Sequence, residues 1–112
     1  MKKQSLCMLL ALAALPLLVQ ADTGSVTIVS PAANATLKAT ADNQISYDVT
    51  PGPQGDHTHL YVDGKEVAVL RELKGSYTLK SLAPGAHEMC IKVVNKSHTP
   101  IGIEKCIGVK VE

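Results

Sequence analysis

The sequence predicts an all-β protein, an antiparallel two-sheet sandwich of seven or eight short strands. Three observations lead to this prediction. Several short segments alternate apolar and polar residues with a period of two, which is typical of half-buried strands. Clusters of Gly, Pro, Asn and Asp separate these segments at regular intervals. After residue 21 no segment has the periodicity of an amphipathic helix. Many short strands separated by turns favour a sandwich.

The N-terminal segment has the composition of a secretory signal peptide. It begins with Met and two lysines, is apolar from residue 6 to residue 19, and reaches a small residue at Ala21. We expect cleavage after Ala21, so that residues 1–21 are the signal peptide and residues 22–112 form one domain. The apolar stretch is shorter than a membrane span requires. A retained membrane anchor is the alternative.

The charge of the expected mature domain excludes some functions. Without the two lysines near the start, nine basic side chains remain against ten acidic ones, a net charge near −1. The basic residues are scattered along the chain. Such a distribution does not attract nucleic acid or an anionic membrane surface. We therefore expect no nucleic-acid binding and no membrane span in the mature chain.

Five strands are predicted in the first part of the domain. Pro31 stops the first of them, and the residues Asn34-Ala35-Thr36 after it are interpreted as a turn. Prolines and glycines make residues 51–56 a compact loop. Asp63-Gly64 between two β-rich segments is a strong hairpin signal. The five predicted strands are residues 25–30, 44–50, 57–62, 65–70 and 75–80.

Residues 82–111 are predicted to form a long β-hairpin. Aliphatic and polar side chains alternate in both halves, and residues 95–100 supply turn residues and a proline. Folding the hairpin about His98 places Cys90 opposite Cys106. These are the two cysteines of the mature chain, and an even number in an exported chain favours a disulfide. We predict this disulfide and a periplasmic or secreted location.

Short motifs add a family resemblance. The segment Leu82-Ala83-Pro84-Gly85-Ala86-His87 resembles the corner before strand F of fibronectin type III and bacterial immunoglobulin-like domains. Ser30-Pro31 at the end of the first strand also resembles those modules. The stretch from Asp56 to Lys65 resembles a segment of small exported bacterial proteins of unknown role. In pattern the resemblance covers essentially the whole mature chain, and it implies an immunoglobulin-like sandwich, a fold that hosts many functions.

Three histidines provide the main functional hypothesis. His57 and His59 are two residues apart, so they share a strand face with Tyr61, opposite Leu60. In the implied sandwich the loop that holds His98 lies at the same end. Two imidazoles at this spacing and one from a neighbouring loop could bind zinc or copper, and such a site would release the metal on acidification. The alternative is that His57 and His59 are solvated positions and that His98 is a loop-tip residue.

Other candidates have less support. Asp56 could add a carboxylate to the histidines. His87 is expected at the opposite end of the sandwich, donating to a backbone carbonyl. There is no Gly-x-Ser-x-Gly elbow and no Cys-x-x-Cys motif, and the glutamates are interpreted as isolated, solvated strand positions. The sequence therefore predicts a protein that is not an enzyme.

The predicted function is that of a non-enzymatic exported module with a binding or accessory role, monomeric and without a cofactor. The alternative is a periplasmic zinc- or copper-binding protein that uses His57, His59 and His98. A protein partner could bind the outer sheet face around Tyr61, which would be flanked by His59 and by the predicted Cys90–Cys106 disulfide.

Overall fold

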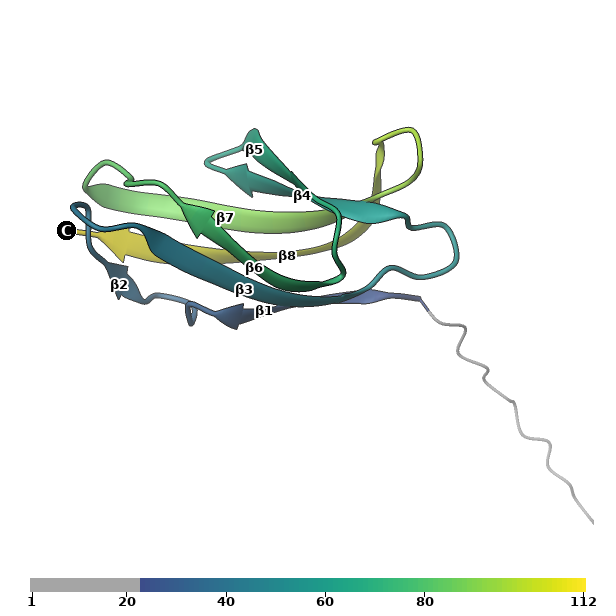
Figure 1. Cartoon of the computed structure of the whole chain (residues 1–112), viewed down its shortest axis with the longest axis horizontal. Helices are drawn as coiled ribbons and strands as arrows, with labels where there is room; N and C mark the ends of the chain where they lie inside the picture. The colour runs from purple at the N-terminus through teal and green to yellow at the C-terminus, as the bar shows by residue number, and fades with distance from the viewer. Residues whose placement is uncertain (1–22) are drawn as a thin grey trace, which may run out of the picture.

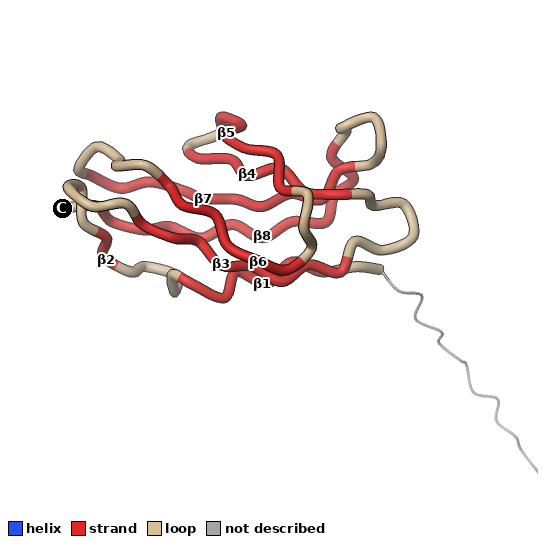
Figure 2. The backbone as a smooth tube through the Cα atoms, in the orientation of Figure 1, coloured by secondary structure: helices blue, strands red, loops and turns tan. Residues whose placement is uncertain are grey.

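The computed structural model describes residues 23–112, so the expected signal peptide lies outside the described residues. This part of the chain consists of strands, turns and loops (Figures 1 and 2). Within it, no helix is long and apolar enough to cross a membrane. The strands are β1 (Ser25–Ser30), β2 (Thr36–Leu37), β3 (Asn43–Thr50), β4 (His57–Val62), β5 (Lys65–Leu70), β6 (Lys74–Leu79), β7 (Gly85–Val94) and β8 (Pro100–Val111).

The strands form two sheets that pack face to face (Figure 1). One sheet has three strands in the order β1-β3-β6, and the other has five in the order β2-β8-β7-β4-β5. Both chain-adjacent hairpins, β4–β5 and β7–β8, are antiparallel. The predicted two-sheet sandwich with its short strands is therefore confirmed. In the five-stranded sheet β4 lies beside β7, and its first residue, His57, pairs with Val94 at the end of β7. The start of β4 is therefore close to the loop that joins β7 and β8.

The short strand β2 departs from the prediction. The residues Asn34-Ala35-Thr36 were expected to form only a turn, but β2 begins at Thr36 and runs parallel to β8. The Asn34 N–H donates to the Gly108 carbonyl at 2.7 Å, and the Lys110 N–H donates to the Ala35 carbonyl at 2.9 Å. The chain crosses from one sheet to the other here, and this short pairing satisfies backbone groups at the edge of β8. The sandwich is thus antiparallel except at this edge.

The β7–β8 hairpin has the predicted register. Cys90 pairs directly with Cys106, and the two form a disulfide. The register shifts beyond Lys92, where β8 carries extra residues around Gly102, whose φ is +91°. An irregularity of this kind bends a strand pair. Beyond it the β7–β8 loop, residues 95–99, lies against β4, at the same end of the sandwich as the loop before β4 (Figure 2).

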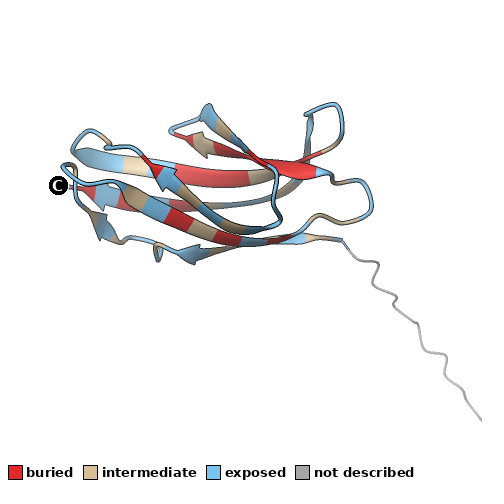
Figure 3. Cartoon of the chain, in the orientation of Figure 1, coloured by how far each residue is buried: buried red, intermediate tan, exposed pale blue. Residues whose placement is uncertain are grey.

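The core lies between the two sheets and is almost entirely aliphatic (Figure 3). The alternating strands predicted from the sequence supply it, and burying such side chains contributes roughly 1.5–3 kcal/mol each. In β4, however, burial does not alternate, because both faces at the start of the strand are covered. The buried apolar side chains of this cluster are Ile45, Tyr47, Val49, Leu60, Val62, Leu70, Leu79, Met89, Ile91, Val93, Ile107 and Val109.

His87 links the chain just after β4 to the corner before β7 by hydrogen bonds. Its Nε2–H donates to the Ala83 carbonyl at 2.7 Å, as expected, and its Nδ1 lies 2.6 Å from Asp63 Oδ2. The Glu88 N–H donates to Asp63 Oδ1 at 2.9 Å. The hydrogen bond to Asp63, followed by that to Ala83, raises the pKa of His87. The Glu88 N–H, followed by His87, lowers the pKa of Asp63.

We expect the His87–Asp63 pair to stabilise the fold within a window of pH. Because the folded-state pKa of His87 is raised, its contribution is complete below the ordinary value of 6.5 and is lost as pH rises through the folded value. Because the pKa of Asp63 is lowered, its contribution is present above 3.8 and is lost as pH falls through the folded value. The pair should therefore contribute most between these two ordinary values.

The comparison of the parent chain with His87→Gln measures this contribution. The difference in their free energies of unfolding should be larger at about pH 5.5 than at about pH 8.5, because the imidazole loses its charge as pH rises through its folded-state pKa. The change should stay below about 1 kcal/mol, since the Asp63 carboxylate is half exposed. Urea unfolding at both pH values gives the two differences, and equal differences would contradict the assignment.

Candidate metal centre

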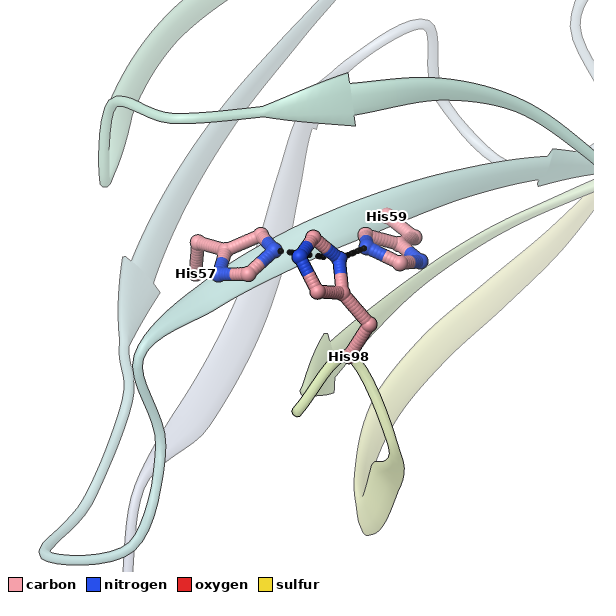
Figure 4. Close-up of side chains that lie close together, drawn as sticks. All are labelled: His57, His59 and His98. Atoms are coloured by element: carbon pink, nitrogen blue, oxygen red, sulfur yellow. Dashed lines mark hydrogen bonds between the residues drawn. The ribbon is translucent and has the colours of Figure 1, made fainter. Parts of the chain in front are cut away.

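The first two candidate ligands lie at the start of β4, the strand between β7 and β5 in the five-stranded sheet. Leu60 and Val62 of β4 point into the core, so His57 and His59 occupy the outer face, as the period of two predicts. Both histidines are nevertheless buried, with exposed fractions of 2% and 3%. The alternative that they are solvated strand positions is therefore wrong, because the β7–β8 loop covers this part of the outer face (Figure 4).

The β7–β8 loop is held by Asn95. Its Oδ1 accepts the N–H groups of Ser97 at 2.9 Å and Thr99 at 3.0 Å, and its carbonyl accepts the His98 N–H at 2.9 Å. His98 has a φ of +65°, in the left-handed region that non-glycine residues rarely adopt. The hydrogen bonds of Asn95 support this conformation. As a result, the His98 ring lies over β4 between the two other imidazoles (Figure 4).

The three rings bring their nitrogens together. His98 Nδ1 lies 3.3 Å from His57 Nε2 and 3.0 Å from His59 Nε2. One ligand nitrogen from each residue lies within 4.8 Å of the others. Zinc–nitrogen bonds of about 2.0–2.1 Å at tetrahedral angles separate two ligand nitrogens by roughly 3.3 Å. The two short spacings are therefore close to those of a tetrahedral metal site.

The protons of the three imidazoles do not account for both short contacts. Asp56 Oδ2 accepts the Nδ1–H of His57 at 2.8 Å, and this hydrogen bond is the main reason that the pKa of Asp56 is lowered. With one ring proton, on Nδ1, the imidazole of His57 presents only a lone pair on Nε2. The Nδ1–H of His98 would have to serve His57 and His59 at once. A metal ion would instead accept one lone pair from each ring.

A second carboxylate lies behind His59. Glu66 Oε1 is 3.2 Å from His59 Nδ1, but the direction of this contact does not make a hydrogen bond. Burial lowers the pKa of His59; Glu66 opposes this effect, and His57 and His98 add to it. A lowered pKa favours the neutral imidazole, which is the form that binds a metal.

The carboxylates of Asp56 and Glu66 lie behind His57 and His59, where groups that orient metal-binding histidines commonly lie. The sequence suggests Asp56 as a further ligand, but in the structure its carboxylate contacts the ring nitrogen of His57 that faces away from the cluster. The sequence indicates that Glu66 is an isolated, solvated strand position, yet in the structure it approaches the corresponding nitrogen of His59. The sequence feature that could have placed Glu66 near His59 is the Asp63-Gly64 turn, because this hairpin folds β5 back along β4. Carboxylates in this position fix the tautomer and orientation of metal-binding histidines.

Close packing of the β3–β4 loop positions Asp56. The Asp56 N–H donates to the Val94 carbonyl at 2.8 Å. At Gly55 a Cβ atom would lie 2.6 Å from Val93 Cγ1 and would also overlap the Pro51 carbonyl. Only glycine fits this approach without a shift of the loop. The residue before His57 is thereby fixed against the end of β7.

Tyr61 lies on the outer face beyond the cluster. Its ring centroid is 6.5 Å from that of His59, and the Lys92 ammonium lies 4.6 Å from its centroid, a cation–π contact. Tyr61 pairs with Cys90 across β4 and β7, so it is also next to the disulfide, as expected. The structure does not bring Tyr61 into the histidine cluster. Its role as a partner surface stays a prediction, as does the monomeric state.

Comparisons with known proteins identify the fold. No protein-family model matches this chain, and no curated protein matches it in sequence. The fibronectin(III)-like modules of CbhA from Clostridium thermocellum superpose with a TM-score of 0.64 at 17% identity, over 78% of this chain and 95% of that one. The chain thus has the fibronectin type III-like, immunoglobulin-like fold that the sequence predicted.

Two further structures share the sandwich. The CARDB domain of a Pyrococcus furiosus protein, solved in complex with di-metal ions, gives a TM-score of 0.55 at 12% identity, over 80% of this chain and 86% of that one. A lytic polysaccharide monooxygenase from Jonesia denitrificans gives 0.51 at 18% identity, over 70% of this chain and 58% of that one. At these identities the similarity concerns the fold alone.

Proposed function

We propose that this protein is a metal-binding module that holds one zinc or copper ion with His57, His59 and His98. The observation that carries the proposal is the meeting of three imidazole nitrogens, with His98 Nδ1 at 3.3 Å and 3.0 Å from the other two. The rings of His57 and His59 are buried, and hydrogen bonds within the loop support the backbone of His98. The site therefore needs little rearrangement to bind, which favours affinity.

The donor set selects the class of metal. Three neutral imidazoles suit zinc and copper, whereas calcium and magnesium prefer oxygen ligands. With a given set of nitrogen donors, copper(II) binds more tightly than zinc. Both metals are therefore candidates, and the affinity for copper(II) should be the higher one.

The metal-binding module is proposed to act in an oxidising compartment, either the periplasm or the cell exterior. The Cys90–Cys106 disulfide supports this location, because such bonds persist mainly outside the cytoplasm. There the protein acts as a non-enzymatic accessory module. Its similarity in fold to fibronectin(III)-like modules supports that role.

Thermal unfolding in the presence of metal tests the proposal. One zinc or copper(II) ion should raise the unfolding midpoint, because a ligand that binds only the folded state stabilises it, by about 2.7 kcal/mol at a free concentration of 100 times Kd. His98→Ala should remove this rise by deleting the third ligand. This variant should fold, since His98 is exposed. His57→Ala/His59→Ala should remove it as well.

The fourth histidine provides the matched control. His87 lies at the other end of β4 and makes its hydrogen bonds with Asp63 and Ala83, so His87→Ala should keep the full metal-dependent rise. Isothermal titration should give one ion per chain for the parent and for this control. An equal rise in His98→Ala and in the parent would refute the proposal.

A further inference from the structure

The number of protein ligands at the proposed metal site is three. Within residues 23–112, the group of ligand-type side chains around His98 consists of His57, His59 and His98. Zinc takes four ligands in most protein sites, and copper(II) takes four or more. Three imidazoles therefore leave at least one coordination position to be filled. Sites with such a position differ from closed structural sites, in which the protein supplies all four ligands.

The neighbouring carboxylates are engaged elsewhere. Asp56 Oδ2 is hydrogen-bonded at 2.8 Å to His57 Nδ1, the nitrogen opposite the one in the cluster. Glu66 Oε1 lies 3.2 Å from His59 Nδ1, again behind the ring. To bind the ion directly, either carboxylate would have to leave its histidine and pass around the imidazole. Their present contacts support the rings instead of completing the coordination sphere.

The exposure of the three histidines shows where solvent reaches the cluster. His57 and His59 are buried in the face of the sheet, with exposed fractions of 2% and 3%. His98 is exposed and covers them from the loop. A ligand from solution can therefore approach an ion in the cluster only from the side of His98. The buried side is closed by β4 and by the core beneath it.

We propose that the ion bound by His57, His59 and His98 keeps one coordination position for a ligand from outside the chain. This inference rests on the proposed metal site. The ligand is a single nitrogen or oxygen donor that approaches past His98, such as an imidazole or a small anion. With this position the module can exchange its metal with another donor, because an incoming ligand can bind before any of the three histidines leaves.

Copper(II) with added azide and imidazole tests the open position. The parent protein is loaded with one equivalent of copper(II) and freed of unbound metal by gel filtration. Addition of azide should produce an azide-to-copper charge-transfer band that saturates, while the copper stays bound to the protein. Imidazole, the neutral donor, should shift the electron paramagnetic resonance spectrum in a saturable manner. A response to azide alone would restrict the ligand to anions, and one to imidazole alone would restrict it to neutral nitrogen donors.

Two variants separate this inference from the metal site itself. His87→Ala should bind copper and respond to azide as the parent does, whereas His57→Ala/His59→Ala should retain no copper after gel filtration. If the parent retains copper but neither probe changes its spectra, the open position is refuted and the metal site stands. If the parent retains no copper, both proposals fail. An azide band of equal strength in the double variant would assign the copper to another place and refute the inference.

Discussion

Replacing Leu60 with alanine should lower the free energy of unfolding by about 3–5 kcal/mol. Leu60 lies at the centre of β4 with an exposed fraction of 0%, between the two sheets. The substitution removes buried methyl groups and leaves a cavity that the neighbouring side chains fill only in part. For a small domain this is a large share of a total stability of about 5–15 kcal/mol. Urea unfolding of the oxidised protein measures it.

Leu73→Ala is the matched control for this prediction. Leu73 lies between β5 and β6 with an exposed fraction of 38%, so the same chemical change removes fewer buried contacts. The free energy of unfolding should fall by less than about 1 kcal/mol in this variant. A similar loss in both variants would contradict the burial of Leu60 as the cause of the effect.

Removing the disulfide with Cys90→Ala/Cys106→Ala should lower the free energy of unfolding by about 3 kcal/mol. The bond closes a loop with a sequence separation of 16, and it restricts the unfolded chain more than the folded one. In the folded state the strand pairing already places Cys90 opposite Cys106, so the sheet should keep its register without the bond. Urea unfolding of the parent and the variant gives the difference.

Reduction of the parent protein provides an independent measurement. Under a strong reductant its free energy of unfolding should fall by a similar amount, while the variant should not respond. Metal binding should also be measured in the variant: the three histidines lie towards the loop of the β7–β8 hairpin, where His59 pairs with Lys92, two residues from Cys90. Retained metal binding would show that the loss of stability does not come from a change in the histidine cluster. A loss well below about 1 kcal/mol in both experiments would show that the disulfide adds little to this sandwich.

The fold was predictable from local patterns. Alternation in β4, β7 and β8 predicted which side chains enter the core, and Asp63-Gly64 predicted the β4–β5 hairpin. The pairing of Cys90 with Cys106 followed from the symmetry of the hairpin about His98. Each of these signals depends on residues near one another in the sequence, or on a single turn between two strands.

Predictions about the histidines were correct in part. Their shared face followed from the period of two, and the common end of the sandwich followed from the implied fold. Their burial did not follow, because it depends on the β7–β8 loop folding over β4. The loop covers the two histidines because the hairpin bends, because Asn95 forms hydrogen bonds within the loop, and because His98 has a left-handed backbone conformation.

The sequence alone therefore determined the strands other than β2, their buried faces and the disulfide, because alternation and turn residues act over short distances along the chain. The tertiary structure decided that three imidazoles meet, that Asp56 and Glu66 stand behind two of them, and that β2 pairs parallel to β8. These features depend on side-chain directions and on contacts between segments as far apart as residues 57 and 98. A shift of a few ångströms in one loop would separate these side chains and leave the strand pattern unchanged.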